Sequence, residues 1–317
     1  MSTRTFESKP AVRESVPLLV GLFGPSGSGK TYSSLRLATG IQKVTGGEIF
    51  VIDTESRRAC HYADRFKFQH VDFRSPFGSL DYLEVIQYCA SKGAKVIVVD
   101  SLSHEHEGPG GYLMTQAEEV TRMAGDDWQK AERVKFSAWI KPAKMRRQLI
   151  NGILQLNINL ISCFRAKEKL RLERGKDPLP LGWMPIAGDE FLFEQTTCAL
   201  LYPGCKGVPT WNPEMPGEKT MFKLPEQFIG MMNDGKAMSE EHGIKLAEWA
   251  RGEIHEPTLS QGELEAQGEL ASNKGLTEYE HWFKSLTAKQ RLAVKDRHEK
   301  WKLNASLVNS RSETQCS

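Results

Sequence analysis

The chain has 317 residues, of which 39% are hydrophobic and 26% are charged, and its formal net charge is +2. This composition excludes wholesale disorder, and the near-neutral total charge indicates no particular class of partner. No apolar run approaches the roughly 18 residues that a membrane-spanning helix needs, so we expect no membrane partner. The cysteines are scattered without a C-x-x-C pair, which disfavours disulfides and a cysteine-rich zinc site and favours a cytoplasmic protein with reduced thiols.

From residue 17 onward, short apolar runs alternate with segments of helical periodicity. Five runs are largely apolar without regular alternation, at residues 18–23, 49–52, 96–99, 159–164 and 197–202. Such runs are typical of strands that are buried on both faces of a parallel sheet. Segments such as 79–92 and 142–157 space their apolar residues as helices do. The pattern predicts an α/β fold with a mainly parallel sheet flanked by helices.

Composition divides the chain into four parts. Residues 1–16 are a polar tail, and residues 17–250 carry the alternating pattern of the core. Residues 251–275 are rich in Gly, Glu, Gln and Ser and hold few large apolar side chains, so we expect a linker. Residues 276–317 contain two capping-box patterns and predict a small helical hairpin. Because such a hairpin buries little core alone, we expect it to dock on a protein partner.

The strongest motif is a phosphate-binding loop, G-x-x-x-x-G-K-[ST], between the first apolar run and a helical segment. Its glycines let backbone N–H groups surround a phosphate, and the helix directs its positive end at the same anion. Lys30 can reach the β- and γ-phosphate oxygens, and the Thr31 hydroxyl can bind Mg²⁺. The predicted nucleotide-binding residues are Gly24, Pro25, Ser26, Gly27, Ser28, Gly29, Lys30, Thr31 and Tyr32.

Acidic residues follow two of the predicted strands. Asp100 ends the third apolar run, where ligands bind in open α/β sheets, and is the predicted holder of Mg²⁺ through water; the alternative is a cap of the next turn. Glu55 follows the second run and is the predicted carboxylate that orients the attacking water. Its competitors are Glu105 and Glu107 in a His-Glu-His-Glu run. That run lacks H-E-x-x-H spacing, which disfavours a zinc site.

Together these features resemble the core of RecA-like ATPases, and more closely the phage- and prophage-encoded P-loop ATPases of AAA or RecA-like type. The resemblance covers roughly residues 17–250. Beyond the motifs above, it includes residues 164–169, 182–185, 191–197 and 239–250. It implies ATP hydrolysis with Mg²⁺, action on DNA in recombination or replication, assembly into a homo-oligomeric ring or filament, and the cytoplasm of a bacterial host.

One position departs from RecA itself. There an Asn-Gln pair that senses the γ-phosphate follows the strand corresponding to residues 160–163, whereas Phe164 and Arg165 stand here. The resemblance therefore makes Arg165 or Lys167 the expected sensor of the γ-phosphate, or the residue that completes a neighbouring subunit's site. A basic loop without a catalytic role is the alternative.

Positive charge is concentrated in residues 133–176, where twelve basic and two acidic residues give a net charge of +10. A segment this basic is the electrostatic footprint of a polyanion. Phe136, Trp139 and Phe164 are interleaved with the charges, as in surfaces that stack single-stranded bases. We therefore expect this stretch to bind single-stranded DNA; a solvated helix face with Trp139 in the core is the alternative.

Two other functions fit a phosphate-binding loop. One is a small-molecule kinase, in which Arg165, Arg171 and Arg174 would clamp a second substrate. The other is a nucleotide switch without hydrolysis that recruits a protein through residues 276–317. The sequence lacks the Asn-Lys-x-Asp signature of GTPases, the ABC signature and a helicase motif. The resemblance and the basic stretch together make a DNA-dependent ATPase the preferred prediction.

Overall fold

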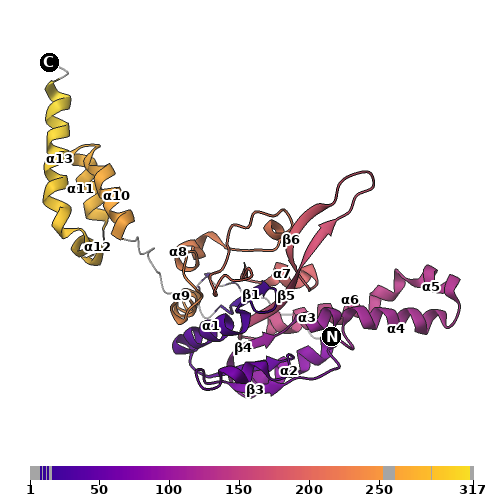
Figure 1. Cartoon of the computed structure of the whole chain (residues 1–317). Coiled ribbons are helices and arrows are strands. Elements are labelled where there is room, and N and C mark those ends of the chain that lie inside the picture. Colours follow the sequence, from indigo (N-terminus) through magenta and orange to yellow (C-terminus); the bar gives the residue numbers. More distant parts are fainter. Residues whose placement is uncertain are drawn as a thin grey trace. The chain divides into compact units, whose positions relative to one another are not determined.

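The computed structural model describes residues 16–252, 261–286 and 288–314, together with residues 8, 10, 11 and 13. Most of the predicted polar tail therefore lies outside the described residues. The chain forms two compact units, Met1–His255 and Glu256–Ser317, and each is described by itself (Figure 1). No helix within the described ranges is long and apolar enough to cross a membrane.

The first unit is built on a seven-stranded sheet with the order β3-β2-β4-β5-β1-β7, and β6 pairs with β5. The strands are β1 (Leu19–Gly24), β2 (Glu48–Asp53), β3 (Gln69–Asp72), β4 (Ala94–Asp100), β5 (Asn159–Arg171), β6 (Leu179–Pro185) and β7 (Thr197–Leu200). All the pairings are parallel except that of β5 with β6. The predicted α/β fold with a mainly parallel sheet is confirmed, and its five apolar runs are β1, β2, β4, the first half of β5, and β7.

Helices cover both faces of the sheet. Helices α1 (Lys30–Thr45) and α9 (Glu240–Ala250) share one core with Val20 and Leu22 of β1. Helices α2 (Ser79–Ser91), α6 (Ile140–Gln155) and α7 (Asp189–Glu194) share the other core with Leu19 and Phe23 of the same strand. Since alternate residues of one strand enter opposite cores, every position must be apolar, which explains the continuous runs.

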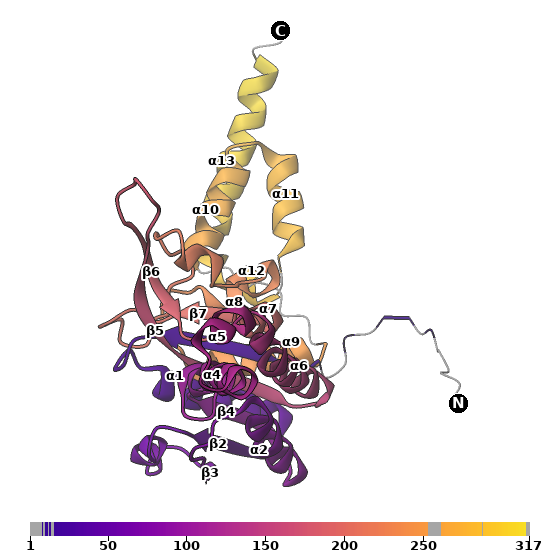
Figure 2. The same cartoon turned by 90° about the vertical axis from the view of Figure 1, so that its right-hand side faces the viewer.

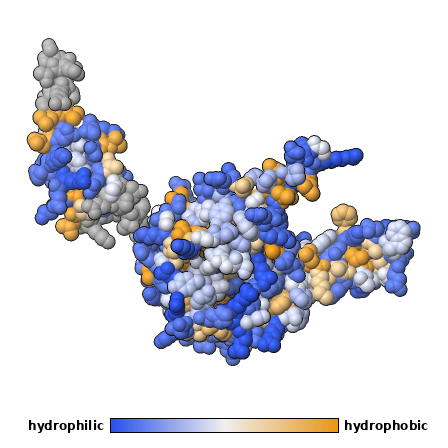
Figure 3. Space-filling view, viewed as in Figure 1, coloured by the Kyte–Doolittle hydropathy of each residue, from blue (hydrophilic) through white to orange (hydrophobic). Residues whose placement is uncertain are grey.

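Two arms project from this unit (Figure 1). The helical arm consists of α4 (Tyr112–Ala124) and α5 (Trp128–Val134), and short α3 (Ser103–Glu107) connects β4 to its base. The β-hairpin arm consists of the second half of β5 and β6, beyond the edge of the parallel sheet. Figure 3 shows both arms as projections from the body of the unit. The sequence pattern did not reveal the hairpin, because its strands lack the apolar runs of the core.

The second unit contains α10 (Gln261–Ser272), α11 (Leu276–Ser285), α12 (Ala288–Ala293) and α13 (Lys295–Thr314) (Figure 2). The prediction of a linker at 251–275 is therefore wrong for residues 261–272, which form α10. Leu264 and Ala271 are spaced by two helical turns, so both enter one core with Tyr279 and Trp301. The sparse apolar residues of this segment form a helical face, which its Gly- and Glu-rich composition obscured.

Helices α1 and α9 cross at a pair of glycines. A methyl group at Gly40 would collide with the carbonyl oxygen of Glu240, and a methyl group at Gly243 would collide with the carbonyl oxygen of Leu37. Because both obstacles are backbone atoms, relief requires a shift of a whole helix. The close approach of α9 to α1 therefore depends on these glycines. The position of α1, the helix that follows the phosphate-binding loop, depends on this contact as well.

We predict that Gly40→Ala lowers the free energy of unfolding by roughly 1–3 kcal/mol, the usual effect of overpacking. The control is Lys43→Ala, which creates the same residue at an exposed position of the same helix and should change stability by less than about 0.5 kcal/mol. Chemical denaturation followed by circular dichroism measures both. Equal stability of the two variants would contradict a tight contact between α1 and α9.

Candidate nucleotide-binding site

The phosphate-binding loop connects β1 to α1, as its motif requires. Gly27 and Gly29 have φ values of 78° and 92°, in the left-handed region that glycine adopts without strain. The Lys30 side chain folds back over the loop, and its Nζ donates hydrogen bonds to the carbonyl oxygens of Gly24 at 2.8 Å and Pro25 at 2.7 Å. Burial lowers the pKa of Lys30, while nearby carboxylates oppose that shift. The loop thus holds one cation over the concavity.

Thr31 and Asp100 meet beside this loop. The Thr31 hydroxyl donates a hydrogen bond of 2.5 Å to Oδ2 of Asp100, which is 5% exposed at the end of β4. Burial raises the pKa of Asp100, and the hydrogen bond from Thr31 opposes this. A hydroxyl and a carboxylate side by side suit Mg²⁺, which takes oxygen ligands and keeps several waters. Oδ2 of Asp100 is therefore directed at the loop.

Glu55 lies opposite the loop and is bound by Arg165. Arg165 donates from Nη2 and Nε to Oε1 of Glu55 at 2.6 and 2.7 Å, and Nη1 of Arg58 lies 3.5 Å from Oε2. Burial by itself would raise the pKa of Glu55, but the hydrogen bond and charge of Arg165, helped by His104 and Arg58, hold it below its ordinary value. The arginine partner of Glu55 therefore lies on β5, 110 residues further along the chain.

These groups surround one cavity of about 750 Å³, a size typical of small-molecule sites. Its lining includes the predicted residues Ser26, Gly27, Gly29, Lys30, Thr31, Glu55, Asp100 and Arg165. It also includes residues that the sequence analysis missed, namely Arg58, His61, Tyr62, Ala166 and Ile186. Arg58, His61 and Tyr62 follow Glu55 in a short 3-10 helix (Arg58–Tyr62), and a basic and aromatic cluster beyond a strand end was the available signal.

Other predicted residues lie elsewhere. Lys167 is exposed on the β-hairpin arm and does not line the cavity, because β5 has left the parallel sheet by that point. Tyr32 packs its ring against Tyr62, with 5.7 Å between ring centroids, so it supports the cavity wall from behind. Ser28 is part of the loop but is 3% exposed and does not line the cavity.

Glu105 and Glu107 have opposite environments. Glu105 is fully buried and is bound by Arg146 at 2.8 Å and by the Ser79 hydroxyl at 2.6 Å, so it cannot reach a water in the cavity. Glu107 is exposed and lines the cavity. Glu55 and Glu107 therefore line the cavity together with Asp100, whereas Glu105 does not. In the described ranges, no group of three or more His, Cys, Asp or Glu side chains could hold a metal ion.

The basic stretch 133–176 does not form one surface. Arg146 is 2% exposed, and Phe164 is fully buried in the core, so neither can contact DNA. Trp139 is half-buried and stacks on Tyr112, with 5.1 Å between ring centroids. Of the interleaved aromatic rings, Phe136 is exposed. The stretch is divided between the root of the helical arm and the β-hairpin arm.

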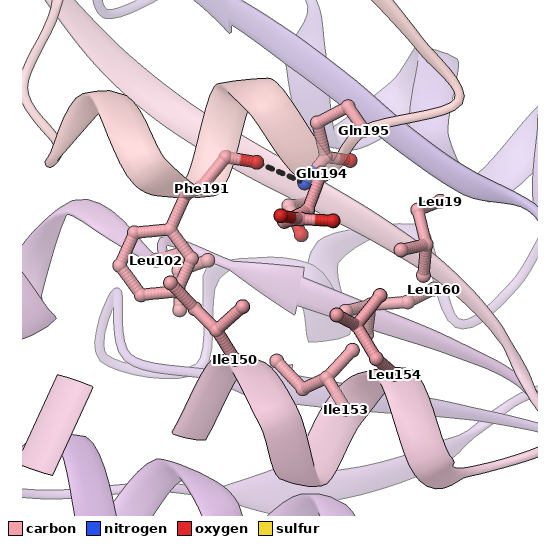
Figure 4. A pocket seen from close by; sticks show the side chains of 10 residues that line it. Leu19, Leu102, Ile150, Ile153, Leu154, Leu160, Phe191, Glu194 and Gln195 are labelled. Atoms are coloured by element: carbon pink, nitrogen blue, oxygen red, sulfur yellow. Dashed lines mark hydrogen bonds between the residues drawn. The ribbon is translucent and has the colours of Figure 1, made fainter. Parts of the chain in front are cut away.

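A smaller cavity lies on the face of the sheet that α6 and α7 cover (Figure 4). Its volume is about 10 Å³, and Ile150, Ile153 and Phe191 supply much of its apolar wall. At its rim, Nε2 of Gln195 donates a hydrogen bond of 3.1 Å to the carbonyl oxygen of Phe191. This volume holds about one water molecule, so the cavity does not compete with the larger one as a ligand site.

We predict that Lys30→Ala weakens the binding of a nucleoside triphosphate by roughly ten- to a hundredfold, because a hydrogen bond to a charged group contributes about 1.5–3 kcal/mol. Titration with a fluorescent ATP analogue in the presence of Mg²⁺ measures the affinity. Lys92→Ala, which removes an exposed lysine at the end of α2, is the control and should bind as the wild type does. Equal affinities of the wild type and Lys30→Ala would show that Lys30 does not bind the nucleotide.

Comparison with known families agrees with this geometry. A family model described as an AAA domain matches residues 17–192, which is more than half of the chain. The matched range includes the loop, Glu55, Asp100 and Arg165, and the family model supports a nucleotide-binding P-loop ATPase. No curated protein matches the chain. On the extent of this match and the fold that carries it, the chain belongs to the AAA domain family.

Proposed function

We propose that this protein is an ATP-binding, Mg²⁺-dependent P-loop ATPase of phage type that acts on single-stranded DNA in recombination or replication. The observation that carries the ATPase proposal is the convergence of Lys30, Thr31, Asp100 and Glu55 on one cavity. Phosphoryl transfer to water needs little covalent chemistry from a protein. It needs positioned cations and an oriented water, and these residue types supply both.

In the proposed reaction, Lys30 exchanges its carbonyl partners for the β- and γ-phosphate oxygens of ATP. Thr31 and, through water, Asp100 hold Mg²⁺, which neutralises the charge between the phosphates. Glu55, ionised at neutral pH, accepts a hydrogen bond from the attacking water and orients it. These assignments need no change of fold, since each of the four residues lines the cavity.

Arg165 supports a nucleotide-dependent step. Its guanidinium now binds Glu55, and a γ-phosphate in the cavity would compete for it with a higher charge. Transfer of Arg165 to the phosphate would release Glu55 to bind water. Arg165 also stands where β5 passes from the parallel sheet into the β-hairpin arm. A ligand bound to the β-hairpin arm would therefore change the position of Arg165, which restrains Glu55.

The β-hairpin arm supports the DNA proposal. Lys167, Lys169 and Arg171 are exposed on β5. Burial lowers the pKa of His106 to about 4, and the charges of Arg146, Lys169 and Lys167 add to this shift. The β-hairpin arm and the helical arm project from the same side of the unit (Figure 1). A single strand between them would meet positive charge and exposed rings such as Phe136.

Assembly is part of the same proposal. We propose a homo-oligomeric ring or filament in the cytoplasm, in which Lys167, which lies outside its own cavity, could complete the site of a neighbouring subunit. We further propose that the second unit binds a protein partner, since Leu292, Leu303 and Leu307 are at least half exposed on its helices. The kinase alternative is less well supported, because Arg171 and Arg174 do not line the cavity.

We predict that Glu55→Gln lowers the rate of ATP hydrolysis by roughly a hundredfold or more while ATP binding persists, because a positioned general base contributes about that factor. Steady-state phosphate release and filter-bound ATP measure the two effects. Glu107→Gln makes the same change in the same cavity and should retain most of the turnover. If Glu107→Gln traps ATP and Glu55→Gln does not, the roles of these carboxylates are reversed.

We predict that replacing Lys169 and Arg171 together by glutamine weakens single-stranded DNA binding and flattens its salt dependence, by a slope of roughly 0.7 for each DNA phosphate that the variant no longer neutralises. Fluorescence anisotropy of a labelled oligonucleotide at several salt concentrations measures both quantities. The control replaces Lys43 and Lys92, two exposed lysines on α1 and after α2, by glutamine. Wild-type protein that ignores DNA at low salt would contradict the DNA proposal but leave the ATPase proposal standing.

A further inference from the structure

Hydroxyl groups outside the cavity join the ends of three neighbouring strands. Thr54 follows β2, and its Oγ1 accepts a hydrogen bond of 2.8 Å from the backbone N–H of Ser101, which follows β4. The backbone N–H of Thr54 also donates to the carbonyl oxygen of Asp100 at 2.8 Å. On β5, the backbone N–H of Arg165 donates to Oγ of Ser103 at 2.8 Å. Asp100 and Arg165 take part in this network through backbone groups. Glu55 directly follows Thr54 in the sequence.

His104 is the imidazole that joins this network. It lies on α3, and its Nδ1 is 2.7 Å from Oγ1 of Thr54. The Phe77 ring stacks on the imidazole at 5.0 Å between centroids and 22° between planes, which restricts the orientation of the ring. The contact therefore joins the first residue after β2 to the helix that follows β4.

The hydrogen-bond partners of Thr54 favour an acceptor role for Nδ1 of His104. The hydroxyl accepts from Ser101 and has one proton to give, either to Nδ1 of His104 at 2.7 Å or to the carbonyl oxygen of Ser101 at 3.2 Å. Tyr82 already donates to that carbonyl oxygen at 2.8 Å. Burial lowers the pKa of His104, and the charge of Arg165 adds to this effect while Glu55 and Glu107 oppose it. A neutral ring can offer Nδ1 as an acceptor.

We infer that His104 is a positioning residue for hydrolysis: its Nδ1 holds the Thr54 hydroxyl and thereby sets the position of the Glu55 carboxylate relative to Asp100. This inference rests on the proposed ATPase function and concerns the same site. His104 is not among the residues that line the cavity, so it acts through Thr54 and not on the nucleotide.

His106 provides an internal comparison. It lies two residues further on the same helix, but its Nδ1 accepts a hydrogen bond of 3.1 Å from Nη2 of Arg146, and its ring stacks on Tyr112. Fully buried Glu105 stands between the two histidines and anchors α3 through Arg146. Helix α3 therefore presents one histidine to the strand ends and another to the root of the helical arm.

The experiment compares two amides at position 104. Asparagine places its amide near the position of Nδ1, whereas glutamine places its amide near the position of Nε2. We expect His104→Asn to retain a kcat close to wild type, and His104→Gln and His104→Leu to lower kcat by about tenfold, as for other residues that orient a functional group through a hydrogen bond. The KM for ATP should stay unchanged in all three variants. Equal kcat values for the Asn and Gln variants would overturn the inference.

A second measurement tests whether His104 acts through Glu55. In a Glu55→Gln background, single-turnover hydrolysis should show no further loss on His104→Leu, because coupled residues give non-additive effects. Losses that multiply would overturn the inference. His106→Gln is the control for replacing a histidine on α3 and should have the kcat of the wild type. Thermal unfolding verifies that each variant folds. Wild-type protein that binds ATP but never hydrolyses it would instead overturn the proposed function.

Discussion

The register of the parallel strands is the constraint on which the site depends. Asp53 pairs with Asp100, and Asp100 pairs with Cys163, so β2 and β4 end at the level of Cys163 in β5. Gly24, where the phosphate-binding loop begins, pairs with Arg165 in the same way. A shift of one residue in any of these pairs would turn a functional side chain to the other face of the sheet.

The apolar residues on both faces maintain this register. Each strand sends alternate side chains into the two cores, so a slipped strand would misplace all of them. The polar groups at the strand ends are then close enough to bind one another. Thr31 meets Asp100, and Arg165 meets Glu55, at this edge of the sheet.

A buried charge pair links the site to the helical arm. Arg146 of α6 binds Glu105 of α3, and its guanidinium lies 3.4 Å from the ring centroid of Tyr112, the first residue of α4. Two buried charges are stable only when their hydrogen bonds are satisfied, and Ser79 and His106 supply the additional partners. The root of the arm is thereby fixed to the helix that carries His104.

Local sequence determined β1, β2, β4, β7 and the first half of β5, together with the loop and the positions of Lys30, Thr31 and Asp100. These depend on short-range patterns: apolar runs, a motif of eight residues and the end of a strand. It did not reveal β3 or β6. It favoured Glu55 over its competitors Glu105 and Glu107 but could not show that Glu55 and Glu105 have different environments. Their difference comes from partners far along the chain, Arg165 for one and Arg146 for the other. It also could not separate Arg165 from Lys167.

Tertiary structure decided these points through pairing and burial. β5 leaves the parallel sheet after Arg165 and pairs with β6, which carries Lys167 away from the cavity. The charge count of residues 133–176 likewise concealed that Arg146 is part of the core. In the second unit, α10 forms because Leu264 and Ala271 find a core in the helices that follow, although their own segment is mostly polar. Net charge and composition are properties of a segment, whereas the role of a side chain depends on which distant residues the fold places around it.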